Sequence, residues 1–421
     1  MRSGSLPRLH AVTRLLPATL SLDELLAFAD PQHPLVWLRD ERGCVGIGEV
    51  TRITASGADR FTSAAAQWLE LLGDAVIDDA VQAPGSGPLA FGSFAFDDQS
   101  AATSSLIVPR LIIGRGAQGS WITEISLSPI SESPRLPEPI ATGAWHGSEL
   151  PVREADPQYL DSVVRGTSEV AAGAAEKLVL ARRVFGSIAD SDDLRVPLSR
   201  LANRYLDCWT FAVDDLLGAS PETLIRRTEG AVTARILAGT RPRCPGDADL
   251  AIRDGLIADP KEQLEHALAV HSVVDAIAPL VEDLTTDPQP FALQLPNVWH
   301  LATDLRATSK RHGTSLDLAG ALHPTAAVAG TPTDVAIASI RRLEGFDRER
   351  YAGAVGWIDA VGDGEWVIAL RCAAVGADAV GSRRVTAYAG GGILADSVPE
   401  REFAETVSKL RPIAEAFAPQ E

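Results

Sequence analysis

The sequence predicts an α+β fold, and two features support this prediction. Residues 209–237 contain short apolar stretches separated by tight turns, the pattern of neighbouring antiparallel strands. Helical periodicity follows in residues 260–281 and returns in residues 399–417. Antiparallel strands followed by helices favour an α+β architecture over a doubly wound parallel sheet.

The first part of the chain contains short elements and no recognisable site of its own. Residues 35–38 and 91–96 are apolar and strand-like, whereas residues 22–29 and 62–72 have helical character. Prolines mixed with Ser, Gly and Glu then fill residues 128–157, which indicates an irregular crossing between two halves.

We therefore divide the chain into residues 1–150, which contribute strands and helices to a common fold, and a catalytic region, residues 155–421. In the second region, residues 260–281 should form a helix whose apolar stripe contains Leu264, Leu268, His271, Val274 and Ala278. The remaining expected elements are strands at residues 177–181, 209–213, 223–227, 231–237, 354–358, 366–373 and 385–389, and a closing helix at 399–417.

Composition limits the possible partners. The chain carries 56 acidic and 38 basic residues, a net charge of −18, which disfavours nucleic acid and anionic membranes as partners. The cysteines form no close pair, so structural zinc and a disulfide framework are not expected, and a reducing cytoplasm fits best. No apolar run is long enough to span a bilayer. An anionic small substrate would therefore need a local basic or metal site.

The closing helix is the most informative segment. Its Glu402, Glu405 and Lys409 lie at i, i+3 and i+7, so two carboxylates and an ammonium share one face. Two close carboxylates are costly without a cation between them, and oxygen-only ligands suit Mg²⁺. Residues 389–392 (AGGG) precede this helix, and we expect a turn there whose glycine amides cradle an anion. A solvated acidic helix face is the alternative.

Three further positions could take part in chemistry, although ordinary surface or strand-end charges would also explain them. Glu265, with His266 beside it, lies near the start of the helix expected at residues 260–281. Lys177 stands at the head of an apolar strand, and a lysine in a water-poor site can serve as a base. Glu222 follows the Gly-Ala-Ser-Pro stretch, and a glutamate in an apolar pocket can stay protonated and act as an acid.

Taken together, these segments resemble the chorismate-utilising enzymes, the family of isochorismate, anthranilate, aminodeoxychorismate and salicylate synthases. The resemblance runs from about residue 177 to the C-terminus, with many motifs in the same order. It implies a sandwich-like core of large antiparallel sheets surrounded by helices. The motifs are KLVLAR (177–182), GASPETL (218–224), LAGTR (237–241), the Glu265-His266 pair, NVWHLAT (297–303), HPTAAVAGTP (323–332), YAGAVGW (351–357), VIALR (367–371) and AGGGIL (389–394).

The resemblance assigns roles residue by residue. It implies Glu265 and Glu405 as direct Mg²⁺ ligands, with Glu402 ordering a bound water, and Mg²⁺ holding the ring carboxylate of chorismate. An Arg fork suits a carboxylate, and Lys supplies a point charge. The other implied substrate positions are Gly239, Thr240, His300, His323, Ala327, Arg371, Gly390 and Lys409.

Lys177 is the discriminating residue within the family. The resemblance implies Lys177 as the base that activates water to attack ring carbon 2, and Glu222 as the acid that protonates the hydroxyl leaving carbon 4. This predicts an isochorismate synthase that serves menaquinone or siderophore biosynthesis and acts as a monomer. A salicylate synthase, which goes on to eliminate pyruvate, and component I of anthranilate synthase are the alternatives. Ala326 departs from the family in replacing a frequent proline, a change conservative in size.

Overall fold

Two large sheets form the centre of the molecule. The computed structural model describes residues 8–244, 246, 248–294, 298–311 and 313–420. Within these residues the first sheet, sheet A, has 12 strands. In spatial order they are β18 (Gly330–Thr331), β10 (Lys177–Ala189), β22 (Ser382–Ile393), β21 (Cys372–Ala377), β12 (Leu216–Ser220), β11 (Trp209–Val213), β2 (Leu35–Arg39), β3 (Arg42–Ile47), β8 (Leu111–Gly116), β9 (Gly119–Ser126), β1 (His10–Leu15) and β5 (Val76–Asp79).

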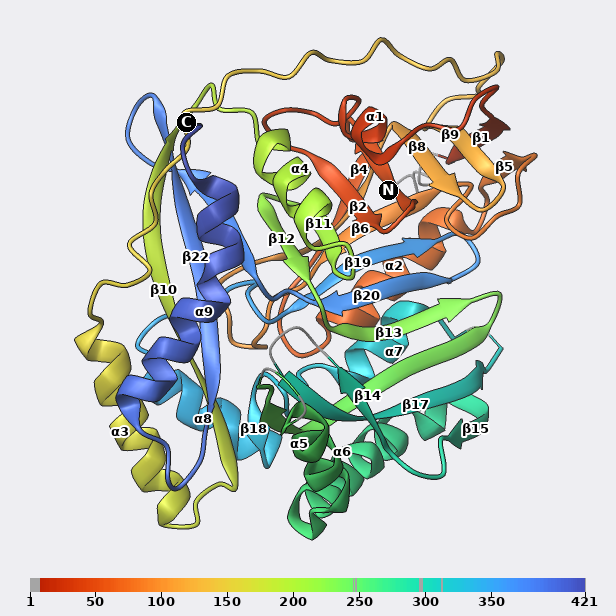
Figure 1. Ribbon diagram of the computed structural model, residues 1–421. Coiled ribbons are helices and arrows are strands. Elements are labelled where there is room, and N and C mark those ends of the chain that lie inside the picture. The colour runs from red at the N-terminus through yellow and green to blue at the C-terminus, as the bar shows by residue number, and fades with distance from the viewer. Residues whose placement is uncertain (1–7, 245, 247, 295–297, 312, 421) are drawn as a thin grey trace, which may run out of the picture.

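The second sheet, sheet B, packs against the first (Figure 1). Its strands are β15 (Val281–Thr286), β17 (Val298–Ser309), β14 (Ala231–Pro242), β13 (Thr223–Thr228), β20 (Gly364–Ile368), β19 (Ala354–Asp359), β6 (Leu89–Ser93), β7 (Ser104–Val108) and β4 (Thr51–Ala55), with β16 (Phe291–Gln294) paired to β17. Among the described strands, every pairing is antiparallel except that of β1 with β5. The α+β prediction with large antiparallel sheets is confirmed.

Both sheets combine strands from before and after the irregular crossing. In sheet A, β11 pairs with β2, and in sheet B, β19 pairs with β6. The crossing itself has no helix or strand between the end of β9 and the start of α3 (Pro157–Ala171), as expected. The boundary near residue 150 as a division of roles stays a prediction.

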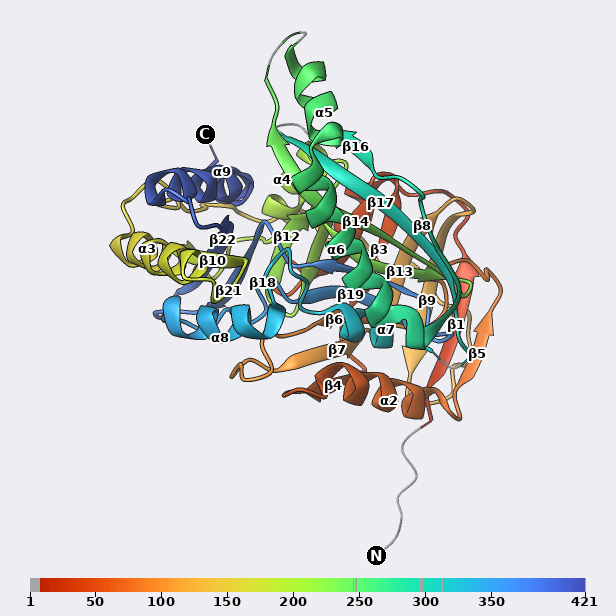
Figure 2. The ribbon, with the colours of Figure 1, turned by 90° about the horizontal axis from the view of Figure 1, so that it is seen from below.

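Helices cover the outer faces of the sheets. Figure 2 shows α3, α8 and α9 grouped around β10 and β22, while α5 and α6 lie over β14 and β17. The helices besides α3 are α1 (Leu22–Leu26), α2 (Arg60–Leu72), α4 (Arg195–Arg204), α5 (Ala248–Ala258), α6 (Pro260–Ile277), α7 (Ser315–Leu322), α8 (Thr333–Leu343) and α9 (Pro399–Phe417), with a 3-10 turn at Ala278–Leu280. None of the helices in the described residues is long and apolar enough to cross a membrane.

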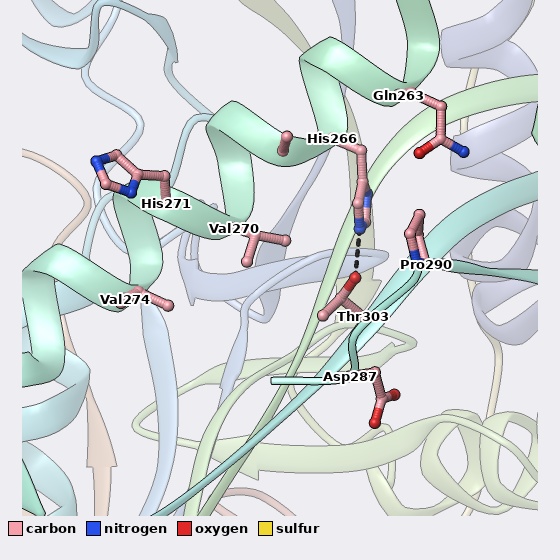
Figure 3. A pocket seen from close by; sticks show the side chains of 9 residues that line it. Gln263, His266, Val270, His271, Val274, Asp287, Pro290 and Thr303 are labelled. Carbon is pink, nitrogen blue, oxygen red and sulfur yellow. Dashed lines mark hydrogen bonds between the residues drawn. The ribbon is translucent and has the colours of Figure 1, made fainter. Parts of the chain in front are cut away.

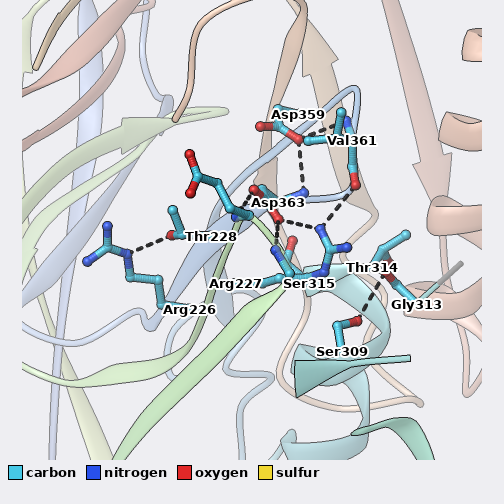
Figure 4. Close-up of polar contacts among 12 residues, drawn as sticks. Arg226, Arg227, Thr228, Ser309, Gly313, Thr314, Ser315, Asp359, Val361 and Asp363 are labelled. Atoms are coloured by element: carbon cyan, nitrogen blue, oxygen red, sulfur yellow. Dashed lines mark hydrogen bonds and ion pairs between the residues drawn. The ribbon is translucent and has the colours of Figure 1, made fainter. Parts of the chain in front are cut away.

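Polar contacts as well as core packing hold the hairpins of sheet B together. The Arg227 guanidinium pairs with buried Asp363 in the β19–β20 turn and also donates to the Val361 carbonyl (Figure 4). Asp359, also buried, accepts hydrogen bonds from the backbone amides of Val361 and Asp363. The β13–β14 turn and the β19–β20 turn are therefore joined at one end of the sheet, which fixes β13 and the residue that precedes it.

Three sequence expectations differ from the structure. Gly390, Gly391 and Gly392 do not form a turn: they belong to β22 and pair with Ala181, Leu180 and Val179 of β10. The turn predicted before α9 is therefore replaced by a strand. A glycine-rich strand and a glycine-rich turn have similar composition, and only the long-range pairing with β10 distinguishes them.

The apolar stripe expected on the helix at residues 260–281 is also wrong. Leu264 and Leu268 are 63% and 54% exposed, whereas His266 is buried between the helix and sheet B. The helix ends at Ile277, and Val281 begins β15. The strand expected at residues 366–373 is two strands, β20 and β21, because Arg371 has a φ of 48° that breaks the extended backbone.

Candidate active site

The charges of three cationic side chains act on Glu222. It occupies the short connection between β12 and β13, where its amide donates to Ser220 Oγ (3.3 Å) and its carbonyl accepts from the Ile368 amide (3.0 Å). Burial raises the pKa of its carboxyl group, and the positive charges of Arg371, Lys177 and Lys409 oppose that rise. A partly buried carboxyl is thus set to hold its proton within reach of three cations.

These three cations come from separate parts of the chain. Lys177 is the first residue of β10, where it pairs with Thr331 of β18. Arg371 lies between β20 and β21, and its carbonyl accepts from the Ala219 amide (3.1 Å). Lys409 lies on α9. The charges of Lys177, Arg371 and Lys409 thus all act on Glu222, and the catalytic and substrate-binding roles of these residues stay predictions.

The glycines of β22 let two lysines approach the sheet closely. A methyl group in place of the Gly392 hydrogen would lie 3.0 Å from Lys177 Cε. Lys409 Nζ donates a 2.8 Å hydrogen bond to the Gly390 carbonyl and lies 2.5 Å from Glu405 Oε1. Gly392 thus leaves room for Lys177 because it has no side chain.

Glu402 and Glu405 converge on Gly391. A methyl group on Gly391 would lie 3.3 Å from Glu402 Oε2 and 3.7 Å from Glu405 Oε1. Glu402 Oε1 accepts a 2.8 Å hydrogen bond from Ser397 Oγ. Burial and the nearby charge of Glu405 raise the pKa of Glu402, against the effects of Ser397 and Lys409. The two carboxylates repel each other, and a cation bound between them would relieve that repulsion.

Gly239, Thr240 and His300 lie where β14 and β17 pair. Gly239 has a φ of 78° at an irregularity of this pairing, and the next residue, Thr240, pairs through its backbone with His300. The Thr240 side chain lies outside the described part of the structure. Burial lowers the pKa of His300, opposed by a hydrogen bond with Gly239 and assisted by the positive charges of Lys177 and Lys409. A neutral His300 therefore faces the same cations as Glu222.

Helix α6 carries Glu265 and His266, and the two side chains have different environments. Glu265 is exposed, whereas His266 is 2% exposed. His266 Nδ1 donates to the Ala238 carbonyl (3.1 Å), and Nε2 lies 2.7 Å from Thr303 Oγ1. Beside it is a cavity of about 270 Å³ between α6 and the strands of sheet B, which Thr303 and Asp287 also line (Figure 3). His266 thus holds α6 to β14 and β17 next to Glu265.

The expected metal ligands are only partly gathered. Glu402 and Glu405 share the Gly391 site on sheet A, but Glu265 lies on a helix that covers sheet B. Within the described residues, no group of three or more His, Cys, Asp or Glu is arranged to hold a metal ion. The carboxylate oxygens around Gly391 are ligands of the chemical type that Mg²⁺ prefers, and the pKa of Glu402 is raised there.

Two other family-implied substrate positions lie in the segment that leads from α7 into β18. Ala327 is exposed in the turn before β18. His323 is half-buried, its ring contacts Phe61 and Phe96, and its Nε2 donates to the Phe96 carbonyl (3.1 Å). Burial lowers the pKa of His323 to about 3, so the ring is neutral here.

The sequence reasoning also missed residues that the structure places in this region. The Tyr351 hydroxyl would lie 3.3 Å from a methyl group on Gly390, and its ring stacks on Tyr388 at 5.0 Å. Glu262, three residues before Glu265, has its Oε2 atom 2.9 Å from the position of a methyl group on Gly239. The E-x-x-E spacing of Glu262 and Glu265, repeated in Glu402 and Glu405, was the sequence feature that could have identified Glu262.

The chain is similar in sequence to a known enzyme family and to several of its members. Residues 12–418 match the family model described as chorismate binding enzyme. The chain is 33% identical over 365 residues to isochorismate synthase DhbC of Bacillus subtilis, covering 83% of this chain and 86% of that protein. It is 37% identical over 348 residues to the protein described as putative isochorismate synthase MenF of Mycobacterium tuberculosis, covering 79% and 87%.

A solved structure agrees over nearly the whole chain. The crystal structure described as putative 2,3-dihydroxybenzoate-specific isochorismate synthase DhbC from Bacillus anthracis superposes with a TM-score of 0.72 at 30% sequence identity. The superposition covers 94% of this chain and 98% of that chain. Because both halves of the chain are included, the match concerns the two-sheet architecture and not just the motif-rich second half.

Proposed function

This chain belongs to the chorismate-binding enzyme family, and on that premise we propose that it is an isochorismate synthase. The reaction consumes one water and releases one: a hydroxyl is gained at ring carbon 2 of chorismate and lost from carbon 4, while the ring double bonds shift. The observation that carries the proposal is the cluster of Lys177, Arg371 and Lys409 around the raised-pKa carboxyl of Glu222.

Lys177 and Glu222 have complementary parts in this proposal. Lys177, acting in its neutral amine form, takes a proton from the attacking water as the water oxygen bonds to carbon 2, and Glu222 gives a proton to the oxygen that leaves carbon 4 as water. A carboxyl group can donate a proton near neutral pH only if its pKa is raised, and burial of Glu222 supplies that condition. General acid and base groups of this kind each contribute about 10²- to 10⁴-fold in rate.

Arg371 and Lys409 bind and orient the substrate carboxylates. Their positive charge inside a chain of net charge −18 gives the dianionic substrate a local site of the opposite sign. Lys409 contacts Gly390 and acts on neutral His300, and these two residues, with Gly239 and Thr240, would contact the ring and its substituents. Ala327 belongs to the proposal as a wall of the site contributed by the turn before β18.

We propose Glu265, Glu405 and Glu402 as the residues that hold Mg²⁺, the first two directly and Glu402 through water. Bound Mg²⁺ supplies charge neutralisation for the ring carboxylate of chorismate. Because α6 and α9 cover different sheets, binding of the cation and substrate would draw their carboxylates together.

Product analysis tests the proposal. Purified protein incubated with chorismate and Mg²⁺ should form isochorismate without pyruvate. Pyruvate together with fluorescent salicylate would instead identify a salicylate synthase. Anthranilate formed when ammonia is supplied would identify an anthranilate synthase component, and no turnover of chorismate under any of these conditions would refute the proposal.

A further inference from the structure

Tyr159 places a buried hydroxyl group beside the two glutamates of α9. The residue lies in the first turn of α3, where its amide donates to Asp156 Oδ1 (2.9 Å). The side chain is 2% exposed, and its hydroxyl has no hydrogen-bond partner among the described residues. A buried hydroxyl without a hydrogen-bond partner is unfavourable, and a phenylalanine of the same shape would avoid that cost.

The hydroxyl points towards the same place as the glutamates. A methyl group on Gly391 would lie 3.6 Å from the Tyr159 hydroxyl oxygen, compared with 3.3 Å for Glu402 Oε2 and 3.7 Å for Glu405 Oε1. Burial raises the pKa of Tyr159, and the negative charges of Glu402 and then Glu405 raise it further. The phenol is therefore a proton donor that faces acceptors.

Glu402 is the partner that the surroundings favour. Its Oε1 already accepts from Ser397 Oγ, and its Oε2 is the oxygen that lies beside Gly391, as the Tyr159 hydroxyl does. Glu405, in contrast, pairs with Lys409. In both views of the ribbon α3 lies beside α9 (Figure 1, Figure 2).

We propose that Tyr159 is a positioning residue for the cation site: its hydroxyl donates to Glu402 Oε2, so that Ser397 and Tyr159 fix Glu402 from both sides. This rests on the proposed function insofar as it takes Glu402 and Glu405 to serve a divalent cation. A carboxylate held at both oxygens is suited to order metal-bound water, which leaves Glu405 as the direct ligand from α9. Groups that orient metal ligands in this way commonly contribute about 10- to 100-fold in metal affinity.

The substitution Tyr159→Phe tests the proposal because it removes only the hydroxyl. Titration of the substrate-free protein with Mg²⁺ by calorimetry, and with Mn²⁺ by electron paramagnetic resonance, should show a loss of affinity of about tenfold or more. The Mg²⁺ concentration for half-maximal turnover should rise by the same factor, and turnover at saturating Mg²⁺ should change much less. Ser397→Ala should weaken cation binding in the same direction.

Tyr388→Phe is the matched control. Tyr388 is also a buried tyrosine, 3% exposed in β22, but its nearby charges include Glu349 and Arg183 and not the glutamates of α9. The Tyr388→Phe variant should bind Mg²⁺ and Mn²⁺ with the same affinity as the unmodified protein. Equal affinity in Tyr159→Phe, an equal loss in both variants, or no divalent-cation binding by the unmodified protein would overturn the proposal.

The outcomes separate this inference from the proposed function. A protein that makes isochorismate and whose Tyr159→Phe variant binds Mg²⁺ normally would refute only the role of Tyr159. A protein that makes no isochorismate, but whose cation affinity falls in Tyr159→Phe, would refute the proposed reaction and retain the role of Tyr159.

Discussion

Lys409 and Glu405 form an ion pair on one face of α9, with Lys409 Nζ 2.5 Å from Glu405 Oε1 and 2.8 Å from the Gly390 carbonyl oxygen. One ammonium group thus neutralises Glu405 and lies over the glycine strand at the same time. A divalent cation that binds Glu405 would take over this neutralisation and leave the Lys409 charge to the substrate. The ion pair therefore links the proposed cation site to the proposed substrate site.

Removal of divalent cations should abolish turnover. Treatment with a chelator is expected to stop isochorismate formation, and added Mg²⁺ should restore it, because the proposed role of Glu402 and Glu405 is to hold that ion against the substrate. Glu405→Gln and Glu265→Gln should each weaken Mg²⁺ binding at least tenfold in calorimetry, since each removes a charged oxygen ligand. Glu400→Gln, an exposed position on the same helix, is the control. Activity indifferent to chelation would contradict the metal assignment.

Loss of the Lys177 amine should remove the base. Lys177→Ala is expected to lower kcat by about 10²- to 10⁴-fold, with unchanged thermal stability because the side chain is partly exposed at the start of β10. Steady-state kinetics with chorismate measure the change, and Lys310→Ala, an exposed lysine that donates to the Pro279 carbonyl, is the control. Turnover that survives in Lys177→Ala would show that this residue is not the base.

Glu222 should set the high-pH limit of activity. Burial raises the pKa of its carboxyl group, so the acid keeps its proton to higher pH than an ordinary glutamate, and the rate falls as pH rises through that raised pKa. Glu222→Gln, which cannot supply the proton, should lower kcat by about 10²-fold or more while chorismate binding persists. The pH dependence of kcat and direct binding measurements check this. An unchanged rate in Glu222→Gln would refute its role as acid, and Glu229→Gln in an exposed turn is the control.

Asp359 should make the fold less stable as the solution becomes neutral. Burial and the neighbouring Asp363 raise the pKa of Asp359 to about 7, against the effects of two backbone amides and Arg227 (Figure 4). The folded state therefore holds a proton that the unfolded state releases near pH 4, so this residue's contribution to stability falls as pH rises from about 4 to about 7.

Asp359→Asn should remove that dependence. Asparagine keeps an oxygen to accept from the Val361 and Asp363 amides but carries no charge. We expect the variant to be more stable by on the order of 1–3 kcal/mol at pH 8, with little difference at pH 4. Denaturant unfolding at the two pH values measures this, and greater destabilisation of the variant at pH 8 than at pH 4 would contradict it.

The sequence predicted the local elements well where short-range pattern decides them. Pro399 at the start of α9, and the face that Glu402, Glu405 and Lys409 share, follow from helical periodicity, and the structure has both. The turn predicted at residues 390–392 was wrong because these residues form a strand by pairing with β10, some two hundred positions earlier in the chain. The resemblance located Glu222 and its cations, but the burial that raises the Glu222 pKa depends on tertiary packing.

The orientation of helix α6 also depends on tertiary contacts that the sequence pattern did not predict. Its apolar positions predicted that Leu264 and Leu268 face the core, but the hydrogen bonds of His266 to Ala238 and Thr303 orient the helix with those leucines exposed. Tyr159 could not have been identified from its sequence position, because an aromatic residue in a helix is normally explained by packing alone. Only its missing hydrogen-bond partner and its approach to Gly391 distinguish it.

Incubation with chorismate and Mg²⁺ in ¹⁸O-labelled water is the most direct test of the reaction assigned to Lys177 and Glu222. Mass spectrometry of the product, with fragmentation to locate the label, should show isochorismate with one ¹⁸O atom in the hydroxyl at carbon 2, and Lys177→Ala should yield essentially none. Isochorismate without the label would contradict attack by water, and salicylate with pyruvate would contradict the assigned product.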